Sequence, residues 1–174
     1  MQLSIVVGNP KPKSRTLAVA EAVADRVAAA TGATIARTLD LCDHADDLFK
    51  WPHDGLAALQ EAVAASDCVV IASPTYKAAY TGLLKAFLDR YPNNGLAGVT
   101  AFPVMTGGSP THAMAVDTAL RPVLVELGAS VPTRGLFFVM TQMAELEAVV
   151  DAWAEHNLDV PATIGPMTHG AVER

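Results

Sequence analysis

The segment Cys68–Ala72 is fully apolar, and it constrains the fold of this chain more than any other feature of the sequence. Four further apolar segments, at residues 3–8, 34–39, 99–105 and 130–139, alternate with stretches of helical periodicity. Strands that are apolar on both faces and separated by helices are typical of a parallel sheet covered by helices on both sides. We therefore predict an α/β three-layer sandwich around a five-stranded parallel sheet in the order 2-1-3-4-5.

Helical periodicity, punctuated by glycine and proline, places five helices between and after these strands. The predicted helices cover residues 14–30, 56–65, 82–91, 112–127 and 143–156. Pro103 falls inside the fourth strand and is expected at a bulge or a ladder end, because proline cannot donate a backbone hydrogen bond. The chain is interpreted as one domain, residues 1–174, with a loosely ordered tail from about residue 158 onward.

Composition narrows the class of protein. The chain has 174 residues, of which 51% are hydrophobic, and a formal net charge of -6. The sequence offers no basic face to neutralise phosphates, so nucleic acid is not an expected partner. No run approaches the ~20 apolar residues of a membrane span, and the first segment reads as a strand instead of a signal peptide. We therefore expect a cytoplasmic protein without a membrane partner. The two cysteines, Cys42 and Cys68, form neither a CxxC motif nor a disulfide framework.

The loop that follows Cys68–Ala72 carries the side chains best suited to a planar ligand. Pro74, Thr75, Tyr76 and Lys77 supply an aromatic ring, a hydroxyl, a cation and backbone N–H groups. In an open α/β sheet, ligands bind outside the carboxyl ends of the strands. These groups suit an electron-rich ring system such as a flavin, and Lys77 is expected to stabilise negative charge on the reduced ring.

The loop after the first strand has the features of a phosphate site. Ser14, Arg15 and Thr16 stand at the predicted start of a helix, where unpaired N–H groups and a partial positive charge favour an anion. Two hydroxyls and a guanidinium add donors that suit phosphate oxygens. The loop matches neither GxxxxGK[ST] nor GxGxxG, the usual nucleotide fingerprints. The alternative is that Ser14 or Thr16 merely caps the helix.

A third loop, after the fourth strand, contains Thr106, Gly107 and Gly108. Adjacent glycines allow a backbone to approach a ligand closely, and their N–H groups suit the polar edge of a flavin ring. The loops after strands one, three and four lie along one edge of the predicted sheet and can therefore form one site. His112 is interpreted as structural, and the histidines show no metal-ligand spacing, so no metal is expected.

Together these motifs resemble the NAD(P)H-dependent FMN reductase family, whose members have a flavodoxin-like fold. The strongest matches are Ser14-Arg15-Thr16, the segment Pro74–Lys85 and Thr106-Gly107-Gly108. The resemblance implies FMN together with NADPH or NADH. It also implies a homodimer or homotetramer, and an electron acceptor such as free flavin, a quinone or a partner monooxygenase. The residues expected to contact FMN are Ser14, Arg15, Thr16, Pro74, Thr75, Tyr76, Lys77, Thr106, Gly107 and Gly108.

The run of residues 112–124 resembles the branch of reductases that serves alkanesulfonate-type two-component monooxygenases. Some members of this branch carry an aromatic residue in this helix, associated with a helical bulge and tetramer packing, where this chain has Thr118. An aromatic side chain can stack on a partner's ring and threonine cannot. FMN held as a prosthetic group is therefore left open beside supply of free flavin.

Two other functions remain open at this point. An electron carrier of the flavodoxin type would bind FMN without using a nicotinamide nucleotide, and a regulatory or scaffolding module would bind no flavin. The basic, proline-containing phosphate loop and the lack of two aromatics that sandwich a flavin count against the carrier. No side-chain base is predicted for a hydride transfer, because the cofactors carry that chemistry.

Overall fold

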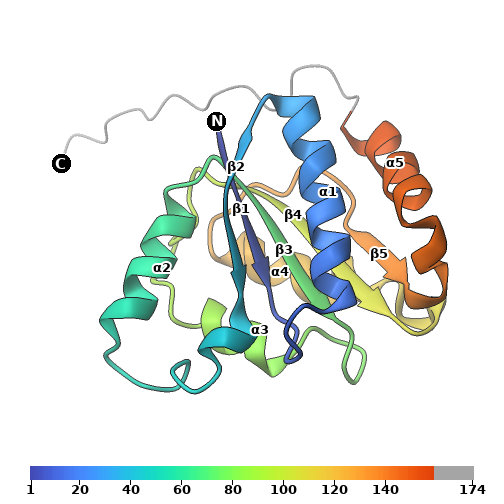
Figure 1. The fold of residues 1–174 in the computed structure, drawn as a ribbon. Helices are drawn as coiled ribbons and strands as arrows, with labels where there is room; N and C mark the ends of the chain where they lie inside the picture. The colour runs from blue at the N-terminus through green and yellow to red at the C-terminus, as the bar shows by residue number, and fades with distance from the viewer. Residues whose placement is uncertain (159–174) are drawn as a thin grey trace.

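The computed structural model of the protein describes residues 1–158 and shows a five-stranded parallel sheet in the order β2-β1-β3-β4-β5 (Figure 1). The predicted sheet order is therefore confirmed. The predicted tail lies outside the described residues from residue 159 onward. The strands are β1 (Gln2–Val7), β2 (Thr34–Asp40), β3 (Cys68–Pro74), β4 (Thr100–Gly107) and β5 (Leu136–Val139).

Helices cover both faces of the sheet, as the apolar strands require (Figure 1). α1 (Arg15–Thr31) and α5 (Leu146–Asn157) pack against one face, which includes Val70 of β3. α2 (Asp54–Ala64), α3 (Gly82–Leu88) and α4 (Arg121–Glu126) pack against the other, which includes Ile71. Neighbouring residues of a strand point to opposite faces. The continuous apolar run of β3 therefore fills two separate cores at once.

The carboxyl ends of the three central strands are held level by their register. Val7 at the end of β1 pairs with Ala72, and Pro74 at the end of β3 pairs with Thr106. Thr81, the residue that caps the N-terminus of α3, connects this helix to the loop after β1. Its hydroxyl donates to the carbonyl of Gly8 at 2.5 Å and accepts from the N–H of Leu84. The three loops predicted to share a site thus emerge side by side.

The predicted helix 112–127 is wrong as a single element. A 3-10 turn, η2 (Pro110–His112), precedes a π-helical turn, η3 (Val116–Leu120), and a short α4. Pro122 stands in the first turn of α4, where it cannot donate to the carbonyl of Thr118 and its ring would crowd that carbonyl in an α-helix. The turn widens instead, and the Arg121 N–H donates to the carbonyl of Val116. The π-helical turn is present although position 118 is a threonine.

The predicted strand 130–139 is also too long. Ser130 forms a single bridge with Thr100, and regular pairing with β4 resumes only at Leu136. Between them the Arg121 guanidinium donates to the carbonyls of Val131 and Thr133 and holds this segment outside the ladder.

Pro103 lies inside the continuous β3–β4 ladder, opposite Ile71, so the predicted bulge is absent there. On its other side, the β4–β5 ladder begins one residue later, at Val104. The N–H of Ala101, two residues before Pro103, donates to the carbonyl of Ser130, which lies on the β5 side of β4. Alternate residues of a strand donate to the same side, so the missing donor of Pro103 falls where β5 has not yet begun. The predicted ladder end is confirmed for this second ladder.

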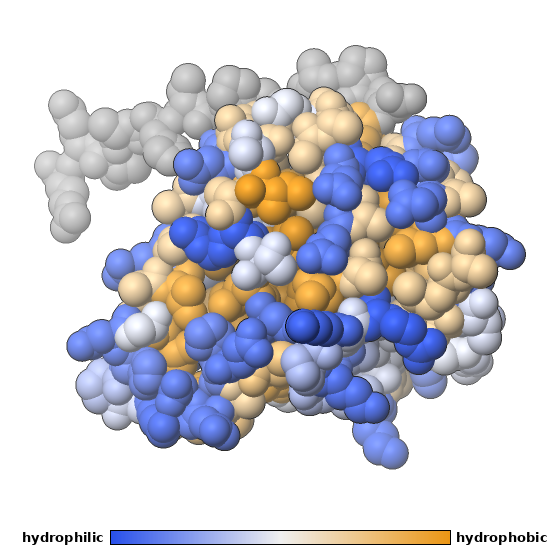
Figure 2. All heavy atoms as spheres, viewed as in Figure 1, coloured by the Kyte–Doolittle hydropathy of each residue, from blue (hydrophilic) through white to orange (hydrophobic). Residues whose placement is uncertain are grey.

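The surface is chemically mixed. Figure 2 shows hydrophobic residues between α1 and α2, bordered by hydrophilic residues above and below. Among residues 1–158, no helix combines the length and apolar character needed to cross a membrane.

Candidate functional site

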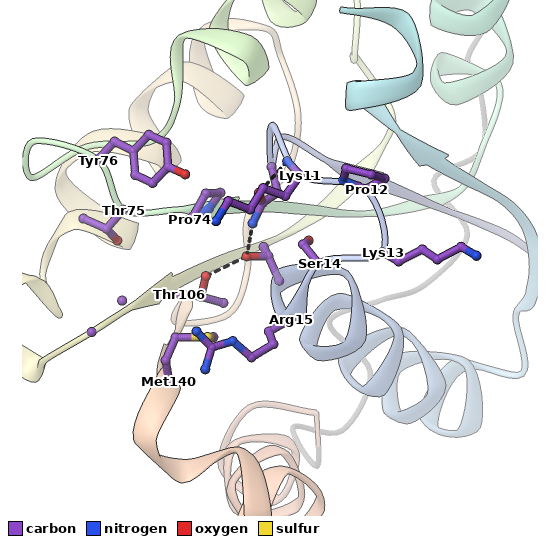
Figure 3. A pocket seen from close by; sticks show the side chains of 14 residues that line it. Lys11, Pro12, Lys13, Ser14, Arg15, Pro74, Thr75, Tyr76, Thr106 and Met140 are labelled. Carbon is purple, nitrogen blue, oxygen red and sulfur yellow. Dashed lines mark hydrogen bonds between the residues drawn. The ribbon is translucent and has the colours of Figure 1, made fainter.

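A cleft of about 440 Å³ opens at the carboxyl ends of β1, β3 and β4 (Figure 3). Nine of the ten residues predicted to contact a ligand line it, and only Lys77 does not. Five residues were not predicted: Asn9, Lys11, Pro12, Lys13 and Met140. The three loops predicted from the sequence therefore do form one site, and β5 contributes a fourth wall.

The end of the cleft at α1 is rich in unused backbone donors. Ser14 caps the helix, since its hydroxyl oxygen accepts from the N–H of Leu17 at 3.1 Å. The capping alternative is therefore correct for Ser14, but its O–H remains available to donate. The N–H groups of residues 13–16 have no hydrogen-bond partner within the described part of the chain. Such donors at a helix N-terminus, aided by the helix dipole, form a natural anion site.

The Thr16 hydroxyl is already hydrogen-bonded within the protein. Thr16 is 2% exposed, and its hydroxyl accepts from the side-chain amide of Asn9 at 2.9 Å and pairs with the Thr106 hydroxyl at 2.8 Å. Asn9 in turn accepts from the N–H of Lys11 at 3.0 Å. Thr16 and Asn9 thus join the β1 loop to β4 and fix the path of the backbone donors. Asn9 could have been identified from the sequence, because a loop asparagine commonly accepts a hydrogen bond from the backbone N–H two residues later, in an Asx turn.

Three cations surround this end of the cleft. Lys11, Lys13 and Arg15 are exposed, and none makes an ion pair with a carboxylate among residues 1–158. Figure 3 shows the Arg15 side chain directed toward Met140 and Thr106, whereas Lys13 points away from the cavity. Arg15 is therefore the cation placed to meet an anion inside the cleft. Met140 is the first residue after β5. From the sequence, only the rule that ligands bind at the carboxyl ends of strands could have identified it as a cleft residue.

The other end of the cleft offers flat surfaces and one unused hydroxyl. The N–H of Thr75 donates to the Thr106 carbonyl at 2.7 Å, which carries the β3–β4 pairing into the loop. The Thr75 hydroxyl is buried and has no hydrogen-bond partner within the described residues. Buried hydroxyls usually find a partner, so this one marks a place for a ligand's polar atom. Tyr76 is 48% exposed and lines the same end.

Lys77 lies in a tight two-residue hairpin of the loop after β3. Tyr76 and Ala79 exchange backbone hydrogen bonds of 2.8 and 3.2 Å. Lys77 and Ala78 between them have positive φ angles of 52° and 64°, the conformation of a type I′ turn. Lys77 does not line the cleft in this structure, and its contact with a ligand stays a prediction.

The two glycines after β4 serve different purposes. A Cβ atom at Gly107 would lie 2.5 Å from the Phe137 ring, so its lack of a side chain is needed for packing against β5. A Cβ atom at Gly108 would meet nothing within 4 Å, and its N–H has no partner among residues 1–158. Gly108 thus has both the open space and the free donor that a close approach to a ligand requires within the described residues.

The remaining candidates lie outside the cleft. His112 and Thr118 are exposed, and the Thr118 hydroxyl donates to the carbonyl of Met114 at 2.9 Å. Asp46 and Asp47, two neighbouring acidic residues between β2 and α2, also lie outside the cleft, and Asp47 pairs with Lys50 at 2.7 Å. Within residues 1–158, no group of three metal-ligating side chains lies together.

The donor set of the cleft fits a phosphorylated flavin. One end offers four backbone N–H groups, the Ser14 hydroxyl and the Arg15 guanidinium, which suit a phosphate dianion. The other offers an orphaned hydroxyl, an aromatic ring and the free N–H of Gly108, which suit a planar ring with polar edges.

Comparison with known proteins identifies the family of this chain. Residues 1–144 match the model of the family described as NADPH-dependent FMN reductase. An FMN reductase (NADPH) of Pseudomonas putida is 39% identical over 104 residues, which make up 60% of this chain and 52% of that protein. The chain spans about half the length of the curated relatives it matches.

Solved structures resemble the whole described fold. NADH:FMN oxidoreductase (EMOB) in its apo form superposes with a TM-score of 0.77 at 32% identity, over 93% of this chain and 92% of that one. A flavodoxin from the domain Archaea superposes with a TM-score of 0.55 at 16% identity, over 90% and 98% of the two chains. The second likeness concerns the fold alone, and it confirms the flavodoxin-like architecture.

Proposed function

Because the chain belongs to the NADPH-dependent FMN reductase family, we propose that it oxidises NADPH or NADH and reduces FMN in the cleft at the carboxyl ends of β1, β3 and β4. The observation that carries this proposal is the division of that cleft into two ends. Within residues 1–158, backbone donors without partners and cations without ion pairs lie at one end, and a buried hydroxyl without a partner lies at the other. A ligand with a phosphate on one side and a flat polar ring on the other satisfies both.

Each residue of the cleft has a part in this proposal. The N–H groups of residues 13–16, the Ser14 hydroxyl and Arg15 bind the phosphate. Thr16 and Asn9 act as positioning residues, because their side chains bond to one another and to Thr106. The Thr75 hydroxyl and the Gly108 N–H donate to the ring edge, while Pro74, Tyr76 and Met140 supply its apolar contacts.

FMN in this cleft supplies a ring that accepts hydride from a reduced nicotinamide. The protein has to hold the two reactants in contact, which replaces much of the entropic barrier. No side chain needs to move a proton in that step. The Gly108 N–H and the positive end of α1 are the groups lining the cleft that favour added negative charge there.

The acceptor, the assembly and the location are further parts of the proposal. Free flavin, a quinone or a partner monooxygenase would take the electrons. Cys42 and Cys68 are both free, which fits the reducing cytoplasm. Several large apolar side chains are exposed, among them Phe49, Trp51 and Met114, which fits a homodimer or homotetramer.

Anaerobic stopped-flow absorbance tests the activity. FMN-loaded protein is mixed with NADPH and, separately, with NADH, and the flavin band is followed. We expect rapid bleaching with at least one nucleotide, and the ratio of rates gives the preference. If FMN binds and neither nucleotide bleaches it, the protein is an electron carrier and the proposed activity is wrong.

A further inference from the structure

The flavin cleft carries more positive charge than one phosphate group uses. The chain has a formal net charge of -6, yet Lys11, Lys13 and Arg15 all line this cleft. Among residues 1–158, no aspartate or glutamate lines it. A cleft lined by charges of one sign raises the local concentration of the opposite ion. With Arg15 assigned to the FMN phosphate, the two lysines remain for a second anion.

The two lysines lie at the outer rim of the cleft. Both are exposed, and neither makes an ion pair with a carboxylate in the part of the chain that the structure describes. Figure 3 shows Lys13 pointing away from the cavity, whereas Arg15 is directed into it. An ammonium group at the rim is placed to meet a ligand that projects out of the cleft, not the phosphate held inside it.

The backbone between the two lysines is constrained. The N–H of Lys11 donates to the Asn9 side chain at 3.0 Å, and the ring of Pro12 fixes the next φ angle. Lys13 has a φ of 50°, in the left-handed region that glycine and asparagine adopt more readily than lysine. Residues held in this region are concentrated at functional sites. The loop thus presents both ammonium groups from a fixed frame and keeps a lysine where the backbone favours other residues.

We propose that Lys11 and Lys13 bind the 2′-phosphate of NADPH, and that the protein therefore prefers NADPH to NADH. The two nucleotides differ only in this phosphate, so a residue that contacts it discriminates between them. The inference rests on the proposed function, because it requires a nicotinamide over the flavin ring. With the nicotinamide at the Pro74–Tyr76 end, the adenosine half of the nucleotide extends toward the rim at α1, the basic stretch of the cleft lining.

A pair of lysines suits a phosphate that stays in contact with solvent. The lysine ammonium is a compact charge on a flexible chain and binds phosphate without a fixed bidentate geometry. NADH carries a hydroxyl at the same position, and this group gains little from a cation. The pyrophosphate is common to both nucleotides, so contact with it would create no preference. Because salt screens exposed charges, the preference should decrease as ionic strength rises.

Steady-state kinetics with each nucleotide test the proposal. We expect kcat/KM to favour NADPH by about tenfold, since exposed charge pairs contribute modestly and two of them act together. In the double variant Lys11→Gln with Lys13→Asn, kcat/KM for NADPH should fall about tenfold and that for NADH far less. Asparagine tolerates the left-handed backbone, so this variant keeps the loop. Saturating FMN throughout keeps a change in flavin affinity out of the comparison.

Arg134→Gln is the matched control. Arg134 is exposed, lies outside the cleft, and makes no ion pair within residues 1–158. Its replacement removes one positive charge from the protein as a whole and should leave the ratio of NADPH to NADH unchanged. A ratio that falls as much in this variant as in the double variant would show an effect of net charge and overturn the proposal.

Calorimetric titration of FMN-loaded protein with NADP⁺ and with NAD⁺ gives a second readout that needs no turnover. NADP⁺ should bind about tenfold more tightly, and the double variant should lose this difference. If neither reduced nucleotide bleaches the flavin, the proposed function is wrong, and the two titrations still decide whether the lysines bind a 2′-phosphate. Equal losses for both nucleotides would place the lysines at the shared pyrophosphate and overturn the inference. So would a parent protein that binds both nucleotides equally.

Discussion

The two ends of the cleft differ in whether their polar side chains are already hydrogen-bonded before a ligand binds. At the phosphate end the side chains bond to each other: Asn9 to Thr16, Thr16 to Thr106 and Ser14 to the helix it caps. At the ring end, the Thr75 hydroxyl is buried without a partner within residues 1–158. The first end is therefore shaped before a ligand arrives and offers its backbone. The second leaves a polar side chain to be completed by the ligand.

This difference has a consequence for mutations. Changes to the hydrogen-bonded side chains at the phosphate end, Asn9 and Thr16, should affect stability and binding together, because these groups build the loop and orient its donors. Changes at the ring end should separate the two properties.

Gly107→Ala should have the largest effect, about 3 kcal/mol of lost unfolding free energy, because the new Cβ would overlap the Phe137 ring. Urea denaturation measures it. Gly108→Ala is the control, and with open space around it we expect a change within about 0.5 kcal/mol. Equal losses of unfolding free energy at both positions would mean that the contact with Phe137 does not distinguish Gly107 from Gly108.

Thr16→Val should cost about 2 kcal/mol of stability, because it leaves the buried Asn9 amide without its acceptor. FMN and riboflavin affinity should fall together with stability, since the loop as a whole loses its shape. Thermal melting and calorimetric titration of the same samples measure both. A variant with full stability and selectively weakened FMN would make Thr16 a direct phosphate ligand instead.

Arg15→Ala should weaken FMN by roughly tenfold, about 1.4 kcal/mol, with little change in riboflavin affinity, because only FMN carries the phosphate. Stability should be unaffected, since Arg15 is exposed and makes no ion pair within the described residues. Lys13→Ala is the matched control and should have a smaller effect, because Lys13 points away from the cavity. Equal losses for FMN and riboflavin would remove Arg15 from the phosphate site.

Thr75→Val should have the smallest effect, with stability unchanged or slightly raised and flavin affinity lowered. Without ligand, the variant should be as stable as the parent or slightly more stable, because an unpaired buried hydroxyl has been removed. Flavin affinity should fall by about 1 kcal/mol, for FMN and riboflavin alike. A loss of stability without ligand would show that the hydroxyl already has a partner in the free protein.

Much of this arrangement was predictable from the sequence, because it follows from local patterns. The apolar run Cys68–Ala72 required burial on both faces, and alternation with helices then set the sheet. The segments Ser14–Thr16, Pro74–Tyr76 and Thr106–Gly108 were placed at the cleft because each lies at the carboxyl end of a parallel strand or in the loop that follows it.

The errors arose where contacts distant in sequence decide the local structure. Pro122 and Arg121 together divide the predicted helix 112–127 and hold residues 131–133 outside the sheet. Gly107 lines the cleft, but the requirement for glycine there comes from the Phe137 ring, thirty residues later in the sequence. Lys77 was assigned from its charge, whereas the hairpin that holds it outside the cleft lining depends on the backbone path, and its contact with a ligand stays a prediction.

A crystal structure of the protein with FMN tests the central claim most directly. The account predicts the phosphate within hydrogen-bonding distance of the N–H groups of residues 13–16 and of Arg15, and a polar edge of the ring against the Thr75 hydroxyl. FMN bound with its phosphate elsewhere, or its ring away from Thr75, would contradict the account of the two ends and the function built on it.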